Sequence, residues 1–330
     1  LTTLLLTHIT DPPNDTPSPG GADIAIVGAG PAGLSAALFL ARYLHDVVVI
    51  DSRDPRNWEA SGVHGYLGLH GIAPPELRGR GRDECREYGV SFIDAKVQTA
   101  ERLGDEHFRL ALADGREIES RRLLLAIGIK DIWPDVPGLD RGYGETVHHC
   151  PDCDGYEARG CRTVVIGSGR RAVGMAVALS TWTTEIVVCT NGETGALPGE
   201  LRQRLEVVGA PVIERRIARA IADGNQVRAL ELDDGSQLEC ERIFFSIGQY
   251  PADDLGEQLG CDHDDEGLIE IDEHHHTSVL NVFAAGDIVP GPHLAITAAA
   301  DGAIAALAIH RSLLPEHRRL PPQRFRVTRG

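Results

Sequence analysis

Cys150 and Cys153 form a Cys-x-x-Cys motif, and Asp154 follows the second cysteine directly. Two thiols at this spacing can close a small disulfide ring, and a neighbouring carboxylate can move the protons that thiol–disulfide exchange requires. Half of a zinc site is the alternative, and it needs two more ligands at suitable spacing. Cys161 is isolated, and neither a second Cys-x-x-Cys nor a His-x-x-x-His follows. The motif therefore predicts redox chemistry rather than zinc binding.

Two groups of histidines could also do chemistry. His148 and His149 directly precede Cys150, where a positive charge would favour the thiolate, but a surface or hinge position fits the sequence equally well. His274 to His276 lie in a segment that we expect to be extended, so three successive side chains cannot converge on one ion, although His274 and His276 could share a face. We therefore predict no metal site. The isolated cysteines that we interpret as small buried apolar residues are Cys85, Cys189, Cys240 and Cys261.

A glycine-rich motif, residues 28–33, stands between an apolar run at residues 24–27 and a helical stretch at residues 34–42. This order of strand, glycine turn and helix is the context in which Gly-x-Gly-x-x-Gly binds a dinucleotide. The glycines allow close approach to a pyrophosphate, which sits on the helix N-terminus. A second strand at residues 47–50 ends in Asp51, which we predict to hydrogen-bond an adenosine ribose.

A second glycine motif, residues 167–172, repeats this arrangement after an apolar run at residues 163–166. Its third small position is alanine, which is an accepted variant. The next strand ends at Cys189, and residues 190–195 offer neither a cation for an NADP 2′-phosphate nor a carboxylate directly at the strand end for an NAD ribose. Arg170 and Arg171 at the helix start could grip phosphate oxygens, with a solvated helix turn as the alternative.

The composition limits the classes of partner. A net charge of −17 over 330 residues would repel phosphate backbones and anionic lipid surfaces, so we expect neither nucleic acid nor membrane as a partner. The seven cysteines show no disulfide-framework spacing, which favours a reducing cytoplasm. The first residues lack the features of a targeting signal, and we expect residues 1–20, rich in Pro and polar residues, to form a flexible tail.

With these motifs in place, the chain resembles the low-molecular-weight thioredoxin reductase family of flavoproteins over residues 21–320. A Cys-x-x-Cys between two glycine fingerprints is one part of the resemblance, and Val-Phe-Ala-Ala-Gly-Asp at residues 282–287 is another. Ala-Ile-Thr at residues 295–297 opens an expected helix, and two strands end in Ala-Ile-Gly (126–128) and Ser-Ile-Gly (246–248). The resemblance implies that Cys153 lies nearest the flavin, that Cys150 exchanges with substrate and that Asp154 is the acid–base group.

The resemblance also implies an α/β fold of two Rossmann-like, three-layer dinucleotide-binding domains, the second inserted into the first. The expected limits are residues 21–133 and 248–330 for the FAD domain and 134–247 for the domain that carries the Cys-x-x-Cys. Hinges are expected near residues 132–144 and 248–254, which are rich in Pro, Gly and Asp. A homodimer is implied as well.

FAD is the expected first cofactor, and NADPH or a second FAD the expected second nucleotide. The residues predicted to bind FAD are Gly28, Gly30, Pro31, Ala32, Gly33, Asp51, Ser52, Asn57, His64, Val97, Ala126, Gly128, Gly286, Asp287, His293, Leu294 and Ala295. Those predicted for the second nucleotide are Gly167, Gly169, Arg170 and Arg171.

The chain departs from standard thioredoxin reductases in three places. The basic run that NADPH-dependent members carry after the strand ending at Cys189 is missing, and His293-Leu294 stands where they have Arg-Gln. Residues 51–76 look more like the branch of gliotoxin-type dithiol oxidases. The expected function is FAD-dependent thiol–disulfide exchange with a thioredoxin-like protein or a small disulfide or dithiol. The alternatives for the electron donor or acceptor are NADPH, a ferredoxin-like donor, a second flavin and oxygen.

Two other classes of function remain open on the sequence. One is a flavin-bearing redox sensor, in which the cysteine pair would report thiol status to a partner. The other is an oxidoreductase that uses FAD and NAD(P)H on substrates without thiols, in which the cysteines would be incidental.

Overall fold

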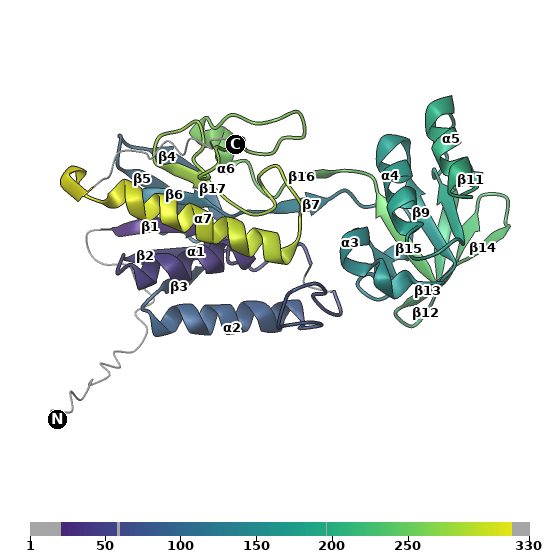
Figure 1. Ribbon diagram of the computed structural model, residues 1–330, viewed down its shortest axis with the longest axis horizontal. Helices are drawn as coiled ribbons and strands as arrows, with labels where there is room; N and C mark the ends of the chain where they lie inside the picture. Colours follow the sequence, from purple (N-terminus) through teal and green to yellow (C-terminus); the bar gives the residue numbers. More distant parts are fainter. Residues whose placement is uncertain (1–20, 58–59, 196, 319–330) are drawn as a thin grey trace, which may run out of the picture.

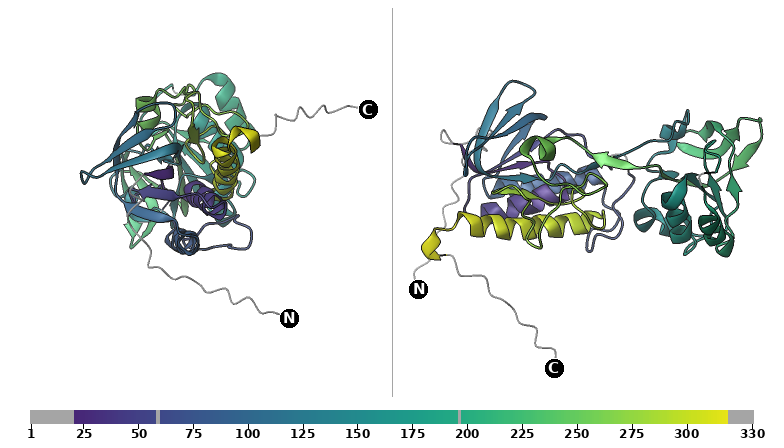
Figure 2. Two further views of the ribbon diagram at one scale, coloured as in Figure 1. Left: turned by 90° about the vertical axis from the view of Figure 1, so that its left-hand side faces the viewer. Right: turned by 90° about the horizontal axis from the view of Figure 1, so that it is seen from above.

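A computed structural model describes residues 21–57, 60–195 and 197–318, and the chain forms two lobes (Figure 1, Figure 2). The first lobe contains a seven-stranded sheet of order β3-β2-β1-β6-β5-β4, with β17 paired to β6. Its strands are β1 (Ala22–Val27), β2 (Val47–Asp51), β3 (Ser91–Asp94), β4 (Val97–Arg102), β5 (Phe108–Leu112), β6 (Glu117–Leu125) and β17 (Val282–Ala284). The expected tail, residues 1–20, and residues 319–330 lie outside the described residues.

Three helices cover one face of this sheet: α1 (Pro31–Arg42), α2 (Pro74–Glu87) and α7 (Ala295–Leu313). The central strands are buried on both faces, as the continuous apolar run of β1 predicts for a parallel arrangement. Helix α1 begins at Pro31 rather than at residue 34, because proline is well suited to the first helical position. Helices α1 and α7 pack closely, since a Cβ at Gly302 would lie 2.0 Å from the carbonyl oxygen of Ala32.

The second lobe is built on a parallel five-stranded sheet of order β11-β10-β9-β15-β8. Helices α4 (Gly169–Leu179) and α5 (Gly199–Val207) pack on one face, and a three-stranded antiparallel sheet packs on the other. The strands of the two sheets are β8 (Val147–His148), β9 (Thr163–Gly167), β10 (Ile186–Cys189), β11 (Val212–Ile213), β12 (Ile217–Asp223), β13 (Gln226–Leu232), β14 (Gln237–Glu239) and β15 (Arg242–Ser246). The predicted α/β class with two Rossmann-like layered units is confirmed.

Two antiparallel strands, β7 (Ile129–Asp131) and β16 (Gln249–Pro251), connect the lobes (Figure 1). Strand β7 directly precedes the first predicted hinge and β16 lies within the second, while the domain limits at residues 133 and 247 stay predictions. The remaining elements are η1 (Leu139–Gly142), α3 (Pro151–Asp154), η2 (Tyr156–Ala158), α6 (Leu255–Leu259) and η3 (Glu316–Arg318). Within the described ranges, no helix is long and apolar enough to cross a membrane.

The expectation of an extended segment at the three consecutive histidines is wrong. Residues 272–276 form a turn, because the Asp272 carboxylate accepts the backbone N–H groups of His274 and His276. His275 adopts a positive φ of 65° and is buried, with its ring nitrogen 2.9 Å from the carbonyl oxygen of Ala284. The His274 and His276 rings meet edge to face with a centroid distance of 6.2 Å.

Candidate active site

The redox pair is placed by the short helix α3. Cys150 is the N-cap residue of this helix, and Pro151 occupies its first position. The Cys153 N–H donates to the Cys150 sulfur at 3.1 Å, and the two residues are joined by a disulfide with a Cα separation of 5.3 Å. Four other cysteines are poor thiolates because they are buried. Burial raises the pKa of the Cys85 and Cys240 thiols to about 12 and also raises the pKa values of Cys189 and Cys261. Those four are buried, as predicted.

The disulfide faces a cavity of about 480 Å³ that the first lobe provides. Its volume lies in the range of small-molecule sites. Cys150, Cys153 and Asp154 line it from the second lobe. The predicted FAD residues that line it are Gly28, Gly30, Pro31, Ala32, Asp51, Ser52, Asn57, His64, Val97, Ala126, Gly128, Gly286, Asp287, His293, Leu294 and Ala295. Segments far apart in the sequence thus meet at one site.

Gly33, the remaining residue predicted for FAD, is outside the lining of this cavity. A Cβ at this position would lie 1.9 Å from the carbonyl oxygen of Gly28, so Gly33 allows helix α1 to pack against the glycine turn. Gly28 itself has a φ of +105°, and a Cβ there would lie 2.2 Å from the carbonyl oxygen of Ala126. The two glycines therefore shape the turn that the cavity requires.

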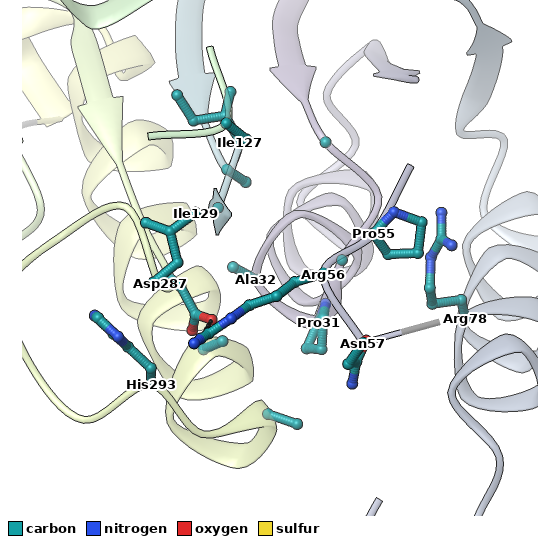
Figure 3. Close-up of a pocket in the computed structure, with 18 of the residues that line it drawn as sticks. Pro31, Ala32, Pro55, Arg56, Asn57, Arg78, Ile127, Ile129, Asp287 and His293 are labelled. Carbon is teal, nitrogen blue, oxygen red and sulfur yellow. Dashed lines mark hydrogen bonds and ion pairs between the residues drawn. The ribbon is translucent and has the colours of Figure 1, made fainter. Parts of the chain in front are cut away.

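Two arginines that the sequence reasoning missed also line the cavity (Figure 3). The guanidinium of Arg56 donates two hydrogen bonds of 2.7 Å to Asp131 and lies 3.3 Å from Asp287. Burial by itself lowers the pKa of Arg56, but the hydrogen bonds to Asp131 outweigh it, so the pKa is raised. Arg78 donates to the buried carboxylate of Asp51 at 2.7 Å. Arg56 belongs to residues 51–76, the segment that resembles the gliotoxin-type branch, whereas no sequence motif marks Arg78 in helix α2.

Asp51, predicted to bind the ribose, lies at the cavity and also organises the charges around it. Its Oδ1 accepts the Ala29 N–H at 3.3 Å, and its Oδ2 accepts from Arg78 and, at 3.0 Å, from Arg82. Arg82 in turn donates to Asp94 at 2.6 Å. The carboxylate is therefore held in place by helix α2 as well as by the end of strand β2.

A hydrogen-bonded cluster joins the lobes next to the cysteines. Tyr143 of the second lobe donates from its hydroxyl to the carbonyl oxygen of Arg56 at 3.2 Å, and the same hydroxyl lies 3.2 Å from Nδ1 of His149. That ring nitrogen is 3.9 Å from the Asp131 carboxylate. Burial and the charge of Arg56 lower the pKa of His149 to about 4. His149 is therefore uncharged near neutral pH and cannot supply a positive charge to the Cys150 thiolate.

Asp154, the predicted acid–base group, has a buried histidine behind it. Nδ1 of His148 lies 3.5 Å from Oδ2 of Asp154, and the exposed fractions of the two side chains are 7% and 20%. The His148 ring packs on Phe244 with a centroid distance of 5.1 Å. From the sequence, His148 is recognisable only as a neighbour of the cysteines. Its contact with Asp154 was not predictable, because it depends on the fold of residues 147–154.

The residues predicted for the second nucleotide lie away from this cavity. Gly167 and Gly169 have positive φ values at the start of α4, as the motif requires. Arg170 and Arg171 are exposed, and Arg171 pairs with Glu266 of the first lobe at 3.2 Å. Cations that the sequence reasoning missed, Arg215 and Arg216, follow the neighbouring strand β11.

Arg215 and Arg216 adjoin the end of strand β10. The Cys189 thiol lies 3.7 Å from the carbonyl oxygen of Arg215, and a Cβ at Gly192 would meet the Cβ of Arg216 at 3.4 Å. Both arginines lie near carboxylates: Arg215 is 3.4 Å from Asp233 and 3.2 Å from Asp234, and Arg216 is 3.7 Å from Asp135. The strand end is therefore mixed in charge rather than basic.

Comparison with known proteins gives matches over most of the chain. The family model for pyridine nucleotide-disulphide oxidoreductases matches residues 22–302. Thioredoxin reductase tcpT of Claviceps purpurea (strain 20.1) is 32% identical over 285 residues, covering 80% of this chain and 86% of the relative. Thioredoxin reductase of Bacillus subtilis (strain 168) is 27% identical over 297 residues, covering 87% and 93%.

Solved structures agree over nearly the same length. The crystal structure of HlmI has a TM-score of 0.86 and 34% identity, covering 91% of this chain and 95% of that chain. The structure of putative thioredoxin reductase TrxB from Bacillus anthracis has a TM-score of 0.83 and 29% identity, covering 88% and 98%. The similarity therefore includes both lobes.

Proposed function

Because the chain belongs to the pyridine nucleotide-disulphide oxidoreductase family, we propose that it exchanges electrons between FAD and the Cys150–Cys153 pair, and then with a substrate disulfide or dithiol. The observation that carries this proposal is that the disulfide lines the same cavity as the first glycine fingerprint and Asp287. The names of its relatives, thioredoxin reductases, support a thioredoxin-like protein or a small disulfide as substrate.

The residues around the cavity fit FAD. Helices α1 and α7 begin at the cavity, and neither N-terminus has a side-chain cap, which suits α1 to a pyrophosphate and α7 to a polar edge of the flavin. Asp51 would accept from the adenosine ribose, and Asp287 from the ribityl chain. Bound FAD would supply a two-electron acceptor or donor opposite Cys153.

The protein's own chemistry is thiol–disulfide exchange, written here for oxidation of a dithiol. A substrate thiolate attacks the Cys150 sulfur, the Cys150–Cys153 bond breaks, and Cys153 leaves as a thiolate with the electron pair. Asp154 takes the proton of the second substrate thiol, whose thiolate then attacks the mixed disulfide. Cys150 leaves and receives that proton from Asp154. The substrate becomes a disulfide, and the pair holds one thiol and one thiolate, with one proton released to solvent.

The electron partner distinguishes a reductase from an oxidase. A reductase fed by NADPH needs phosphate contacts at Gly167, Gly169, Arg170 and Arg171, with Arg215 or Arg216 as the cation near the 2′-phosphate. A dithiol oxidase that passes electrons to oxygen is the second candidate. This candidate is favoured because Arg171 pairs with Glu266, and Arg215 and Arg216 pair with carboxylates. A ferredoxin-like donor or a second flavin would use the same lobe.

Quantifying nucleotide bound per chain, followed by turnover assays with NADPH and with a dithiol plus oxygen, tests this proposal. One FAD per chain and turnover that disappears in both Cys150→Ser and Cys153→Ser are expected. Full turnover in both variants would contradict the proposal. Oxygen consumption with dithiol alone identifies the oxidase, and flavin reduction by NADPH identifies the reductase.

The five cysteines that form no disulfide among the described residues support a reducing cytoplasm as the compartment.

A further inference from the structure

His148 is a buried ionisable side chain that the exchange mechanism above does not use. It ends the short strand β8 and is 6% exposed. Asp154 lines the cavity, whereas His148 lies outside the lining and contacts Asp154 from behind. A histidine in such a position needs a physical explanation, because burial of an ionisable ring without partners is costly.

The surroundings of the ring fix its orientation. Strand β8 pairs with β15 in a register that places His148 opposite Phe244, and the two rings pack together. Nε2 is buried and has no hydrogen-bond partner among the described residues, while Nδ1 lies 3.5 Å from Oδ2 of Asp154. A proton on Nε2 would lack an acceptor. A proton on Nδ1, the nitrogen next to the carboxylate, is therefore the better satisfied of the two.

We propose that His148 is the positioning residue of Asp154: its Nδ1–H donates to Oδ2 and orients the carboxylate toward the cysteine pair. This inference rests on the proposed function, in which Asp154 carries the proton of the second substrate thiol. His148 itself forms and breaks no covalent bond. When Asp154 is protonated during exchange, the hydrogen bond weakens, and it re-forms when the proton passes to Cys150.

Nearby charges leave this role to His148 rather than to His149. The neighbours of His149 are Arg56, Asp131, Asp154 and His148, and burial together with Arg56 keeps its ring neutral near pH 7. Its Nδ1 lies 3.2 Å from the Tyr143 hydroxyl and 3.9 Å from Asp131. His149 is thus engaged at the junction of the lobes, and His148 is the histidine with a contact to the acid–base carboxylate.

The test uses His148→Leu, which removes the donor, and His148→Asn, whose amide nitrogen can take the place of Nδ1. Cleavage of the Cys150–Cys153 disulfide by dithiothreitol at a fixed neutral pH is followed anaerobically by alkylation and mass spectrometry. We expect His148→Leu to slow cleavage about tenfold. His148→Asn should stay within about threefold of the wild type.

A double-variant cycle separates positioning from a structural role. If His148 acts through Asp154, His148→Leu slows cleavage no further in an Asp154→Asn background. Equal losses in both backgrounds, or an unchanged cleavage rate in His148→Leu, would overturn the proposal. Flavin bleaching in the same samples reports separately on the proposed function: if the wild-type flavin does not bleach, that function fails, while the alkylation data still decide the role of His148.

Discussion

His149 lies beside a redox cysteine, yet its surroundings prevent it from acting as a cation. Burial lowers its pKa from 6.5 to about 4, and Arg56 adds to the effect. The same shift links the residue to folding stability. In the unfolded chain this histidine takes up a proton below its ordinary pKa, whereas in the folded protein it stays neutral until about pH 4.

The stability contributed by a neutral His149 is therefore present above pH 6.5 and is lost as the pH falls from 6.5 towards 4. The loss attributable to this residue is roughly 3 kcal/mol at most. Urea unfolding of the wild type and of His149→Gln between pH 4.5 and 7.5 measures it. We expect the variant to show a shallower fall in stability below pH 6.5, and parallel curves would contradict the pKa shift.

The close approach of helices α1 and α7 depends on a glycine. Gly302 is buried in α7, and a Cβ there would overlap the carbonyl group of Ala32. Both helices begin at the cavity, so their separation would disturb the FAD site directly. Gly174 in helix α4 offers a matched control, because a Cβ there would meet nothing within 4 Å.

Gly302→Ala should destabilise the first lobe by about 2 kcal/mol or more, since the overlapping atom belongs to the backbone and cannot be relieved by a side-chain rotation. It should also lower the amount of flavin that co-purifies. Gly174→Ala should be neutral or stabilising by up to about 1 kcal/mol, because alanine is the better helix former. Thermal unfolding and flavin content of the two variants check this, and similar behaviour of both would count against the close helix contact.

Much of the local architecture was predictable from sequence, because its signals are local. The glycine fingerprints, the apolar strands before them and the helix that begins at Ala295 follow from short motifs, and the structure confirms these elements. The partners of Asp51 and Asp154 were not predictable. Arg78 and Arg82 come from a polar helix, and the geometry of His148 depends on a four-residue helix that brings Asp154 back to it.

The two lobes are held together beside the redox pair by the Tyr143 hydroxyl. It donates across the junction to the carbonyl oxygen of Arg56, and a further backbone bond joins the Ser61 N–H to the carbonyl oxygen of Gly144 at 3.4 Å. His64 and Glu157 approach to 3.8 Å between the same lobes. Opening of the junction must break these contacts.

Tyr143→Phe removes the hydroxyl and leaves the ring that packs on Trp133. One hydrogen bond contributes about 1 kcal/mol, so amide exchange in residues 147–154 should accelerate about fivefold if it requires the lobes to separate. Tyr250→Phe is the matched control, because Tyr250 on strand β16 is 51% exposed. Unchanged exchange in Tyr143→Phe, or equal acceleration in both variants, would show that the hydroxyl does not hold the junction.

The central claim is that electrons pass between the flavin and a substrate through the Cys150–Cys153 pair. Anaerobic titration of the purified flavoprotein with dithiothreitol tests it most directly. The readout is the flavin absorbance band at roughly 450 nm, which bleaches when the flavin is reduced. The wild-type flavin should bleach with one dithiol per flavin, whereas the flavin in Cys150→Ser and Cys153→Ser should stay oxidised. Bleaching of equal rate and extent in the wild type and both variants would contradict the account.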